Sequence, residues 1–285
     1  MAKRTLVHLD AFALGTLRYA IGLFLFVLLL VAVEGRGALR YEGRAVSAAL
    51  AGLAGITGFN LFVWLGLGYT LPEHTSVIMA LQTPMTAIAV WALRGQRPSL
   101  FTLACVGAAI CGVLLVVTKG DPVRAVAELA SGGTLFGDFL VFLGAVSWMA
   151  YTLRSASFIG WSPLRFSVLT CIPGFAGLVA AHAIAMLTGH VPIPSVAAIT
   201  PLAWELAYFS ICTVVLGVLA FNAAARRLGA LNTVLCLNLL PICVFGIEAG
   251  LGRRFTAIEL GGALLVVAAL VLNNLYLRHA AVRQS

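Results

Sequence analysis

Charged residues are scarce in this chain. Only 10% of its 285 residues are Asp, Glu, Lys or Arg, and 61% are hydrophobic. A soluble domain carries about a quarter charged residues, so an ordinary soluble fold is excluded for lack of polar surface. Several stretches reach the roughly 20 apolar residues that a helix needs to cross a hydrocarbon core of about 30 Å. The composition therefore predicts an all-α membrane protein with several spans.

Catalytic and metal-binding motifs are also missing. There is no His-Glu-x-x-His, no Gly-x-Ser-x-Gly and no phosphate loop. The six cysteines lie in apolar stretches without Cys-x-x-Cys spacing, and none of the five histidines has a cysteine or carboxylate at metal-ligand spacing. We therefore expect a protein that is not an enzyme and has neither cofactor nor metal. Since no basic domain with interleaved aromatic residues is present, we also expect no nucleic-acid partner.

The apolar segments are long and closely spaced. Alternating ten-residue strands of a membrane barrel are not seen, and the longest connections are residues 119–135 and 188–202. The sequence therefore predicts a helical bundle in the lipid bilayer with nine spans, at about 11–33, 45–68, 74–93, 99–118, 136–154, 166–188, 203–224, 231–250 and 257–277.

The net charge of +8 is distributed unevenly over the connections. When the connections are assigned alternately to two sides, one side receives eleven Lys and Arg residues and the other receives six. Cytoplasmic loops carry the excess of Lys and Arg in inner-membrane proteins. The count predicts a multi-pass protein of the cell inner membrane whose C-terminus is cytoplasmic.

One pattern occurs twice at an offset of 157 residues. Pro84 lies in the apolar segment before Gly95-Gln96-Arg97, and Pro241 lies in the apolar segment before Gly252-Arg253-Arg254. The two prolines fall in the third and eighth spans, and this odd separation means that the two copies cross the membrane in opposite directions. Inverted repeats of this kind are typical of secondary transporters, which bind their substrate near the midplane and expose it to either side in turn.

Three segments resemble helices of the EamA-type repeat of the drug/metabolite transporter superfamily. Residues 137–151 resemble its first helix, residues 228–241 its fourth and residues 255–262 its fifth. The resemblance covers nearly the whole chain. It implies ten helices in two inverted five-helix repeats, both termini in the cytoplasm, and export or exchange of small metabolites, often amino acids.

The sequence departs from that pattern in two ways. The family turn commonly reads Gly-Glu-Arg, whereas Gln96 and Arg253 stand at the glutamate positions here. In addition, the N-terminal repeat, residues 1–118, has only four helices, because the offset of 157 places its first helix before Met1. A connecting loop (119–135), a five-helix C-terminal repeat (136–277) and a cytoplasmic tail (278–285) follow. Two interpretations stay open: a gene start placed too late, which we favour, or a true nine-span chain with an incomplete cavity.

Candidate substrate-binding residues are the polar and aromatic side chains at membrane depth, since such groups are costly unless they face the bundle interior. Residues four apart share a helix face, as Asn60 and Trp64 do. A proline within a span frees a backbone carbonyl, so Pro84 and Pro241 are expected helix breaks. For each single residue the alternative is a helix–helix hydrogen bond or an interface anchor. The candidates for the cavity are Asn60, Trp64, Met79, Gln82, Thr83, Trp148, Tyr151, Tyr208 and Asn238.

Three charged residues lie close to membrane depth. Arg18 is about a third of the way into the first span and resembles an arginine often present in the second helix of this family, so a structural partner or a substrate contact is expected. Glu205 and Glu248 are candidates for coupling transport to protons, because a carboxylate shielded from water holds a proton more readily. For Glu248 the alternative is a local ion pair with Arg253 or Arg254.

These observations lead to one hypothesis and one rival. The hypothesis is a transporter that exports small metabolites, such as amino acids or related amphipathic solutes, by alternating access, with protons as a candidate second partner. The rival is a membrane protein that does not transport, or that needs a partner protein because its cavity lacks a wall. Finding the nine-span chain stable only beside another protein favours the rival.

Overall fold

The computed structural model describes residues 5, 9–94, 99–121, 133–192, 199–228, 233 and 239–282. Every regular element in these ranges is helical. Within them, seven helical runs are long and apolar enough to cross a membrane, and two shorter apolar helices follow near the C-terminus. Each of the nine overlaps one predicted span. The expectation of an all-α membrane protein is therefore confirmed.

The chain forms two compact units, and each takes helices from both halves of the sequence. The first unit comprises residues 1–68 and 147–230, and the second comprises residues 69–146 and 231–285. Helix α9 (Thr134–Ser155) contributes its residues up to Val146 to the second unit and the rest to the first. The predicted division into sequential repeats stays a prediction.

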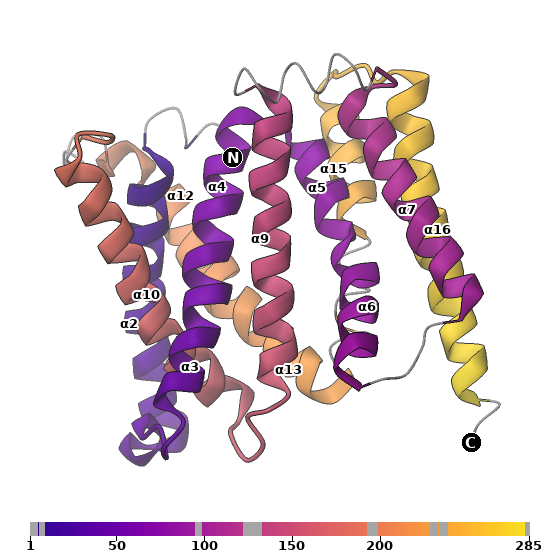
Figure 1. Cartoon of the computed structure of the whole chain (residues 1–285). Coiled ribbons are helices and arrows are strands. Elements are labelled where there is room, and N and C mark those ends of the chain that lie inside the picture. The colour runs from indigo at the N-terminus through magenta and orange to yellow at the C-terminus, as the bar shows by residue number, and fades with distance from the viewer. Residues whose placement is uncertain are drawn as a thin grey trace. The chain divides into compact units, whose positions relative to one another are not determined.

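In the first unit, α10 packs against α2, α3, η2 and α13, while α2 also packs against η4. Figure 1 shows α2, α3 and α10 close to one another. Large exposed apolar side chains such as Phe24, Leu50 and Ile184 suit a lipid environment. The elements are α2 (Ala11–Glu34), η1 (Arg36–Leu39), α3 (Ala45–Gly52), η2 (Leu53–Gly58), α4 (Phe59–Tyr69), α10 (Pro163–Leu187), η3 (Thr200–Leu202), α12 (Ala203–Tyr208), η4 (Phe209–Gly217) and α13 (Val218–Leu228).

In the second unit, α7 and α16 run side by side, and α5 packs against α15, α7 and α16 (Figure 1). This unit also holds the charged ends of several helices, which are described below. Its remaining elements are α5 (Pro72–Ala80), α6 (Gln82–Arg94), α7 (Leu100–Thr118), α15 (Leu239–Gly250) and α16 (Ala257–Val282).

Polar residues just before the apolar runs start the helices. The Asp10 carboxylate accepts hydrogen bonds from two backbone N–H groups in the first turn of α2, each 2.9 Å long. At the start of α10, the Ser162 hydroxyl accepts one such bond, from the backbone N–H of Arg165 at 2.9 Å, and Pro163 is the first helical residue. At α16, Glu259 accepts from the backbone N–H of Thr256 at 2.8 Å, while the Thr256 hydroxyl accepts from Glu259 N at 3.2 Å. This reciprocal capping satisfies two backbone donors that the helix leaves unpaired.

Three helical runs are irregular inside the membrane. η2 and η4 are π-helical segments that interrupt the runs α3–α4 and α12–α13. A turn at Leu81 separates α5 from α6, three residues before Pro84. Proline lacks the N–H that would bond the carbonyl four residues earlier, and its ring clashes with that carbonyl. The break at Leu81 therefore lies where Pro84 disturbs the preceding turn.

Each unit contains a close helix crossing between two glycines. In the second unit, a Cβ on Gly112 would lie 2.7 Å from the carbonyl oxygen of Gly262, and a Cβ on Gly262 would lie equally close to that of Gly112. In the first unit, a Cβ on Gly174 would lie 2.7 Å from the carbonyl oxygen of Gly52. Small residues let backbones approach closely in lipid. The abundant glycines of the sequence thus fix two of its tightest helix contacts.

Candidate functional site

The best-defined polar site of the first unit is built around Arg18. The residue lies in α2, two turns after the helix is capped by Asp10, and only 5% of its surface is exposed. A charged side chain in a transmembrane segment is rare and marks a functional site by default. The surroundings of Arg18 therefore decide what this part of the protein can bind.

The Arg18 guanidinium reaches two neutral side chains and two aromatic rings. Nη2 donates a hydrogen bond to Oδ1 of Asn60, and Nη1 donates to the Thr213 hydroxyl at 3.3 Å. Its carbon lies 4.7 Å from the centre of the Trp64 ring and 5.3 Å from that of Tyr19. Cation–π contacts of this kind offset part of the cost of burying the charge.

Asn60 is held in place from its other end. Its amide Nδ2 donates to the Tyr19 hydroxyl at 3.1 Å and to the carbonyl of Ile56 at 2.5 Å. These two bonds leave Oδ1 directed at Arg18. Asn60 is 1% exposed, so its orientation is fixed by the protein rather than by water.

Arg18 has no acidic partner within ion-pair distance among the described residues. Its Nε is buried without a hydrogen-bond partner, although a guanidinium offers five N–H donors. A buried cation is costly unless it is paired. The site therefore combines a positive charge, spare donors and an apolar wall, which together suit a small anion with an apolar part.

The irregular helices supply this geometry. Thr213 lies in the π-helical segment η4, and its hydroxyl donates to the Phe209 carbonyl at 2.6 Å while it accepts from Arg18. Asn60 is the second residue after η2, the other π-helical segment of the unit. Phe209 also packs edge-on against Trp64 with ring centres 5.5 Å apart. π-helical turns occur frequently at functional sites, because they redirect side chains and backbone groups.

Other predicted candidates in the first unit lie elsewhere. Trp148 and Tyr151 are buried in an aromatic core cluster with ring centres 5.2 Å apart, and the Tyr151 hydroxyl accepts from Asn222 Nδ2 at 2.8 Å. Tyr208 is 41% exposed and Glu205 is half-buried. Of the predicted residues in this unit, the structure brings together Arg18, Asn60 and Trp64.

The predicted residues of the second unit gather at the break between α5 and α6. Met79, Gln82, Thr83 and Pro84 are all buried there. Gln82 Nε2 lies 3.2 Å from the Met79 sulfur, and Gln82 Oε1 is buried without a hydrogen-bond partner.

The remaining predicted features lie in α15 or outside the described residues. Pro241 and Glu248 lie in α15, where Glu248 is half-buried. Asn238 and the first turn, Gly95-Gln96-Arg97, lie outside the described residues.

Sequence reasoning missed a polar cluster at one end of the second unit. Nδ1 of His74 lies 3.0 Å from Oδ2 of Asp138, and the Thr70 hydroxyl donates to Oδ1 of the same carboxylate. His74 and Asp138 are 64 residues apart, so no motif spacing could reveal the pair. The available signal was that both residues start predicted spans on the same side of the membrane.

A second set of charges lies at the same helix ends. Arg253 forms ion pairs with the buried Glu73 and with Glu259, the latter at 3.6 Å. Glu259 also lies 4.0 Å from Lys119. Arg253, the middle residue of the Gly252-Arg253-Arg254 turn, therefore links α5 to the start of α16. Two carboxylates and two cations balance each other in this set.

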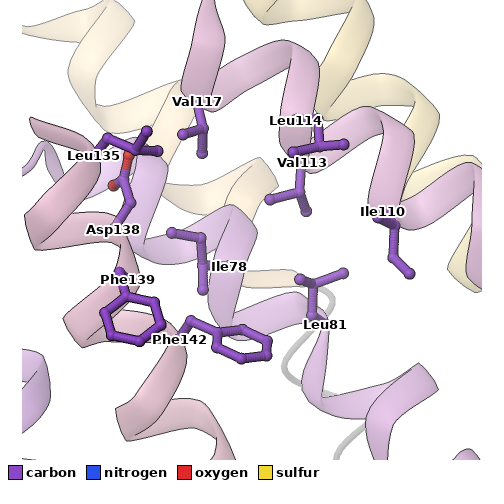
Figure 2. A pocket seen from close by; sticks show the side chains of 10 residues that line it. All are labelled: Ile78, Leu81, Ile110, Val113, Leu114, Val117, Leu135, Asp138, Phe139 and Phe142. Atoms are coloured by element: carbon purple, nitrogen blue, oxygen red, sulfur yellow. The ribbon is translucent and has the colours of Figure 1, made fainter. Parts of the chain in front are cut away.

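Asp138 also borders a cavity of about 300 Å³ between α5, α7 and α9 (Figure 2). Nine of the ten side chains that line it are apolar, among them Phe139 and Phe142, and Asp138 is the one polar exception. Within the described part of the chain, no group of three or more His, Cys, Asp or Glu residues could hold a metal ion.

Comparisons with known proteins agree on the kind of molecule. A family model described as the EamA-like transporter family matches residues 1–118 and 135–275. A Bacillus subtilis (strain 168) protein named Uncharacterized transporter YrdR is 29% identical over 98% of this chain and 87% of its own length. A second protein of that organism, Uncharacterized transporter YyaM, is 28% identical over 94% of this chain and 85% of its own.

One solved crystal structure has the same fold over almost the whole chain. It superposes with a TM-score of 0.64 at 18% sequence identity and covers 97% of this chain and 92% of that one. At this identity the likeness concerns the fold alone.

Proposed function

Because this chain belongs to the EamA-like transporter family and is a multi-pass membrane transporter, we propose that it exports small apolar amino acids across the inner membrane by alternating access. Arg18 binds the carboxylate of the solute. The single observation that carries the substrate class is the buried Arg18 guanidinium, which has no acidic partner among the described residues and an Nε without a hydrogen-bond partner. The direction of transport rests on the family resemblance.

The chemistry of the site supports a carboxylate as the ligand. A guanidinium matches a carboxylate with two parallel N–H···O bonds, which are about twice as strong as bonds between neutral groups. The described contacts use one donor on each terminal nitrogen of Arg18 and none on Nε. Trp64 and Phe209 supply an apolar surface beside the cation for the rest of the solute. An apolar amino acid has both parts.

Counterflow into proteoliposomes tests the proposal. Vesicles containing the full chain are loaded in turn with each of the twenty L-amino acids, and uptake of the same ¹⁴C-labelled compound is measured. At least one apolar amino acid is expected to exchange, and its decarboxylated amine is expected to exchange about tenfold more slowly, as for a lost charged hydrogen bond. No exchange of any of the twenty overturns the function, and equal exchange of the amine overturns the role of the carboxylate.

A variant of Arg18 tests the residue itself. Arg18→Gln keeps a polar side chain of similar length but removes the charge, and we expect counterflow to fall about 30-fold. Arg18→Lys keeps the charge without the planar fork, so an intermediate loss is expected. Thermal unfolding in detergent checks that both variants are folded. Unchanged counterflow in Arg18→Gln contradicts the proposed binding residue.

Direction and orientation need their own measurements. In bacterial cells preloaded with the labelled amino acid, expression of the chain is expected to raise the rate of efflux. A green fluorescent protein fused to the C-terminus is expected to fluoresce. This reporter becomes fluorescent in the cytoplasm but stays dark when it is translocated unfolded across the membrane. Net uptake by the cells, or a dark fusion protein, contradicts the proposed direction or topology respectively.

A further inference from the structure

The His74–Asp138 pair is the one buried histidine–carboxylate contact in the described part of the chain. Both residues are almost fully buried, His74 at 0% and Asp138 at 3% exposure. A carboxylate only accepts hydrogen bonds when ionised, so His74 Nδ1 carries the proton of this contact. Nε2 of the neutral ring is then a bare acceptor, and it is buried without a hydrogen-bond partner.

The charge balance around the pair depends on one proton. The neighbouring set of Glu73, Arg253, Glu259 and Lys119 is balanced within itself. Asp138 has no Lys or Arg within ion-pair distance among the described residues, so with neutral His74 the pair carries one net negative charge. A proton on Nε2 makes the pair neutral overall, and an unbalanced charge away from water is the costly state.

Other titratable and charged groups at this end of the unit lie nearer to water. Asp121 follows α7 and is exposed, Arg254 before α16 is exposed, and Glu248 on α15 is half-buried. Water screens such groups, whereas the buried pair is screened much less. Among the described groups at this end, His74 is thus the buried side chain that offers an unpartnered acceptor, Nε2, to a further proton.

The position of the pair suits a proton that enters from outside the cell. His74 lies in the first turn of α5 and Asp138 in the second turn of α9. These helix ends lie at the upper edge of the second unit in Figure 1, together with the starts of α16 and the end of α7. The distribution of Lys and Arg predicts that this end is the non-cytoplasmic one. Asp138 additionally borders the cavity shown in Figure 2.

We propose that His74 and Asp138 form a proton-binding site whose loading drives export of the solute, and this coupling rests on the proposed transport function. In the loading step, one proton from external water binds the lone pair of His74 Nε2, and Nδ1–H keeps its hydrogen bond to Asp138. Release to the cytoplasm returns the neutral ring. No other bond forms or breaks, and one proton moves inward as solute moves outward.

Binding of the proton is measured without any solute. In bilayers containing the full chain labelled with ¹⁵N-histidine, the pH is varied over about 5 to 8, and we expect one imidazole resonance that changes its protonation state to be absent in His74→Gln. His182→Gln is the matched control, because His182 is also buried with Nε2 unpartnered but lies in the first unit. A His74 resonance that keeps one protonation state over this range overturns the proton site.

Coupling is measured by uptake of an equimolar mixture of the twenty ¹⁴C-labelled L-amino acids. In wild-type vesicles, a lumen more acidic by about one pH unit is expected to raise the initial uptake rate about fivefold, within the tenfold that one pH unit can supply. His74→Gln and Asp138→Asn are expected to lose this stimulation. In these two variants, counterflow with equal pH on both sides is expected to fall by a smaller factor than the uptake that the pH gradient drives. His182→Gln retains the stimulation.

The outcomes separate this proposal from the function on which it rests. Counterflow by the wild type without any response to the gradient overturns the coupling and leaves the transport function standing. A gradient response that survives in His74→Gln also overturns it. Absence of counterflow by the wild type overturns the transport function, and the histidine titration then decides whether the pair binds a proton.

Discussion

The two units handle buried charge in opposite ways. In the first unit, Arg18 is a single buried cation that is held by the neutral groups Asn60 and Thr213 and by aromatic rings. In the second unit, the buried Glu73 has its opposite charge in Arg253, and the buried Asp138 has a histidine partner, His74. A charge without an opposite can bind a mobile ion, whereas paired charges hold helices together. Under the proposed function and the proposed proton coupling, solute recognition belongs to the first unit and proton binding to the second, where the Glu73–Arg253 pair links α5 to the start of α16.

The largest expected effect comes from removing this contrast. Asn60→Asp is nearly isosteric and places a carboxylate against Arg18, so the first unit then has a paired cation like the second. We expect amino-acid counterflow to fall about 100-fold, since the internal carboxylate competes with that of the solute for the same donors. The new charge pair is opposed by the loss of the amide donor to the Ile56 carbonyl, so thermal unfolding in detergent is measured alongside to check that the variant is folded.

Asn60→Ala is the control for that substitution. It removes the hydrogen bond to Arg18 without supplying a charge, and we expect a fall of only about tenfold, comparable to one lost charged hydrogen bond. Similar counterflow in Asn60→Asp and in the wild type would mean that Arg18 is a structural residue whose pairing is irrelevant to transport.

In the second unit, the comparison predicts a loss of stability. Glu73→Gln removes the buried partner of Arg253 and leaves that cation with Glu259 alone at 3.6 Å. Breaking a buried pair from one side costs about 3 kcal/mol, because the remaining charge is uncompensated. The free energy of unfolding in mixed detergent micelles measures this cost.

Glu248→Gln serves as the matched substitution in the same unit. Glu248 is half-buried and has no ion pair among the described residues. A change within about 0.5 kcal/mol is therefore expected, as for a surface position. Equal losses in the two variants would show that the Glu73–Arg253 pair does not anchor α5 to the start of α16.

The glycine crossings are the feature that the units share, and they predict a smaller effect. Gly262→Ala brings a Cβ to within 2.7 Å of the Gly112 carbonyl oxygen, so the backbones must separate. Overpacking of this kind costs about 1–3 kcal/mol. The same loss is expected for Gly174→Ala in the first unit, where the Cβ meets Gly52.

The adjacent Gly261 provides the control. A Cβ on Gly261 meets nothing within 4 Å. Since alanine is the better helix former, Gly261→Ala is expected to stabilise the protein by about 0.5 kcal/mol. The unfolding free energies of the three variants are compared in the same micelles, and a destabilised Gly261→Ala would contradict the crossing as the cause.

The helices of both units could be predicted from sequence because each is a long apolar run between polar residues. Asp10 and Ser162 cap helix starts in the structure, although neither was singled out from the sequence. Arg18 was recognisable because a charge inside an apolar run is costly. Asn60 and Trp64 were recognisable as candidates because a spacing of four residues places both on one helix face.

The partners of the buried charges could not be predicted in the same way. His74 and Asp138, or Glu73 and Arg253, come from helices far apart in the chain, and their contacts depend on how the helices pack. Trp148 and Tyr151 are three residues apart and share a helix face, but that face packs into an aromatic core. Local spacing determines which residues share a helix face, and only tertiary packing determines what that face meets.

The smallest expected effect concerns the pair Arg165–Glu42, the one ion pair among the described residues of the first unit. This pair lies at the surface of the unit. Arg165 Nη2 lies 2.8 Å from the exposed Glu42 carboxylate, to which Trp161 Nε1 also donates at 3.1 Å. The hydrogen bond from Arg165, and after it that from Trp161, lowers the pKa of Glu42. A lowered pKa adds stability above the unfolded pKa, and this stability is lost as the pH falls through the folded pKa.

Wild type and Glu42→Gln are therefore expected to differ slightly at neutral pH, with the wild type more stable, and to converge in acid below the ordinary carboxylate range. Melting temperatures measured across that range test this. Exposed pairs contribute little, so the difference is expected to be far smaller than that of Glu73→Gln. A difference that grows toward acid pH would contradict the sign of the shift. A difference as large as that of Glu73→Gln would remove the contrast between surface pairing in the first unit and buried pairing in the second.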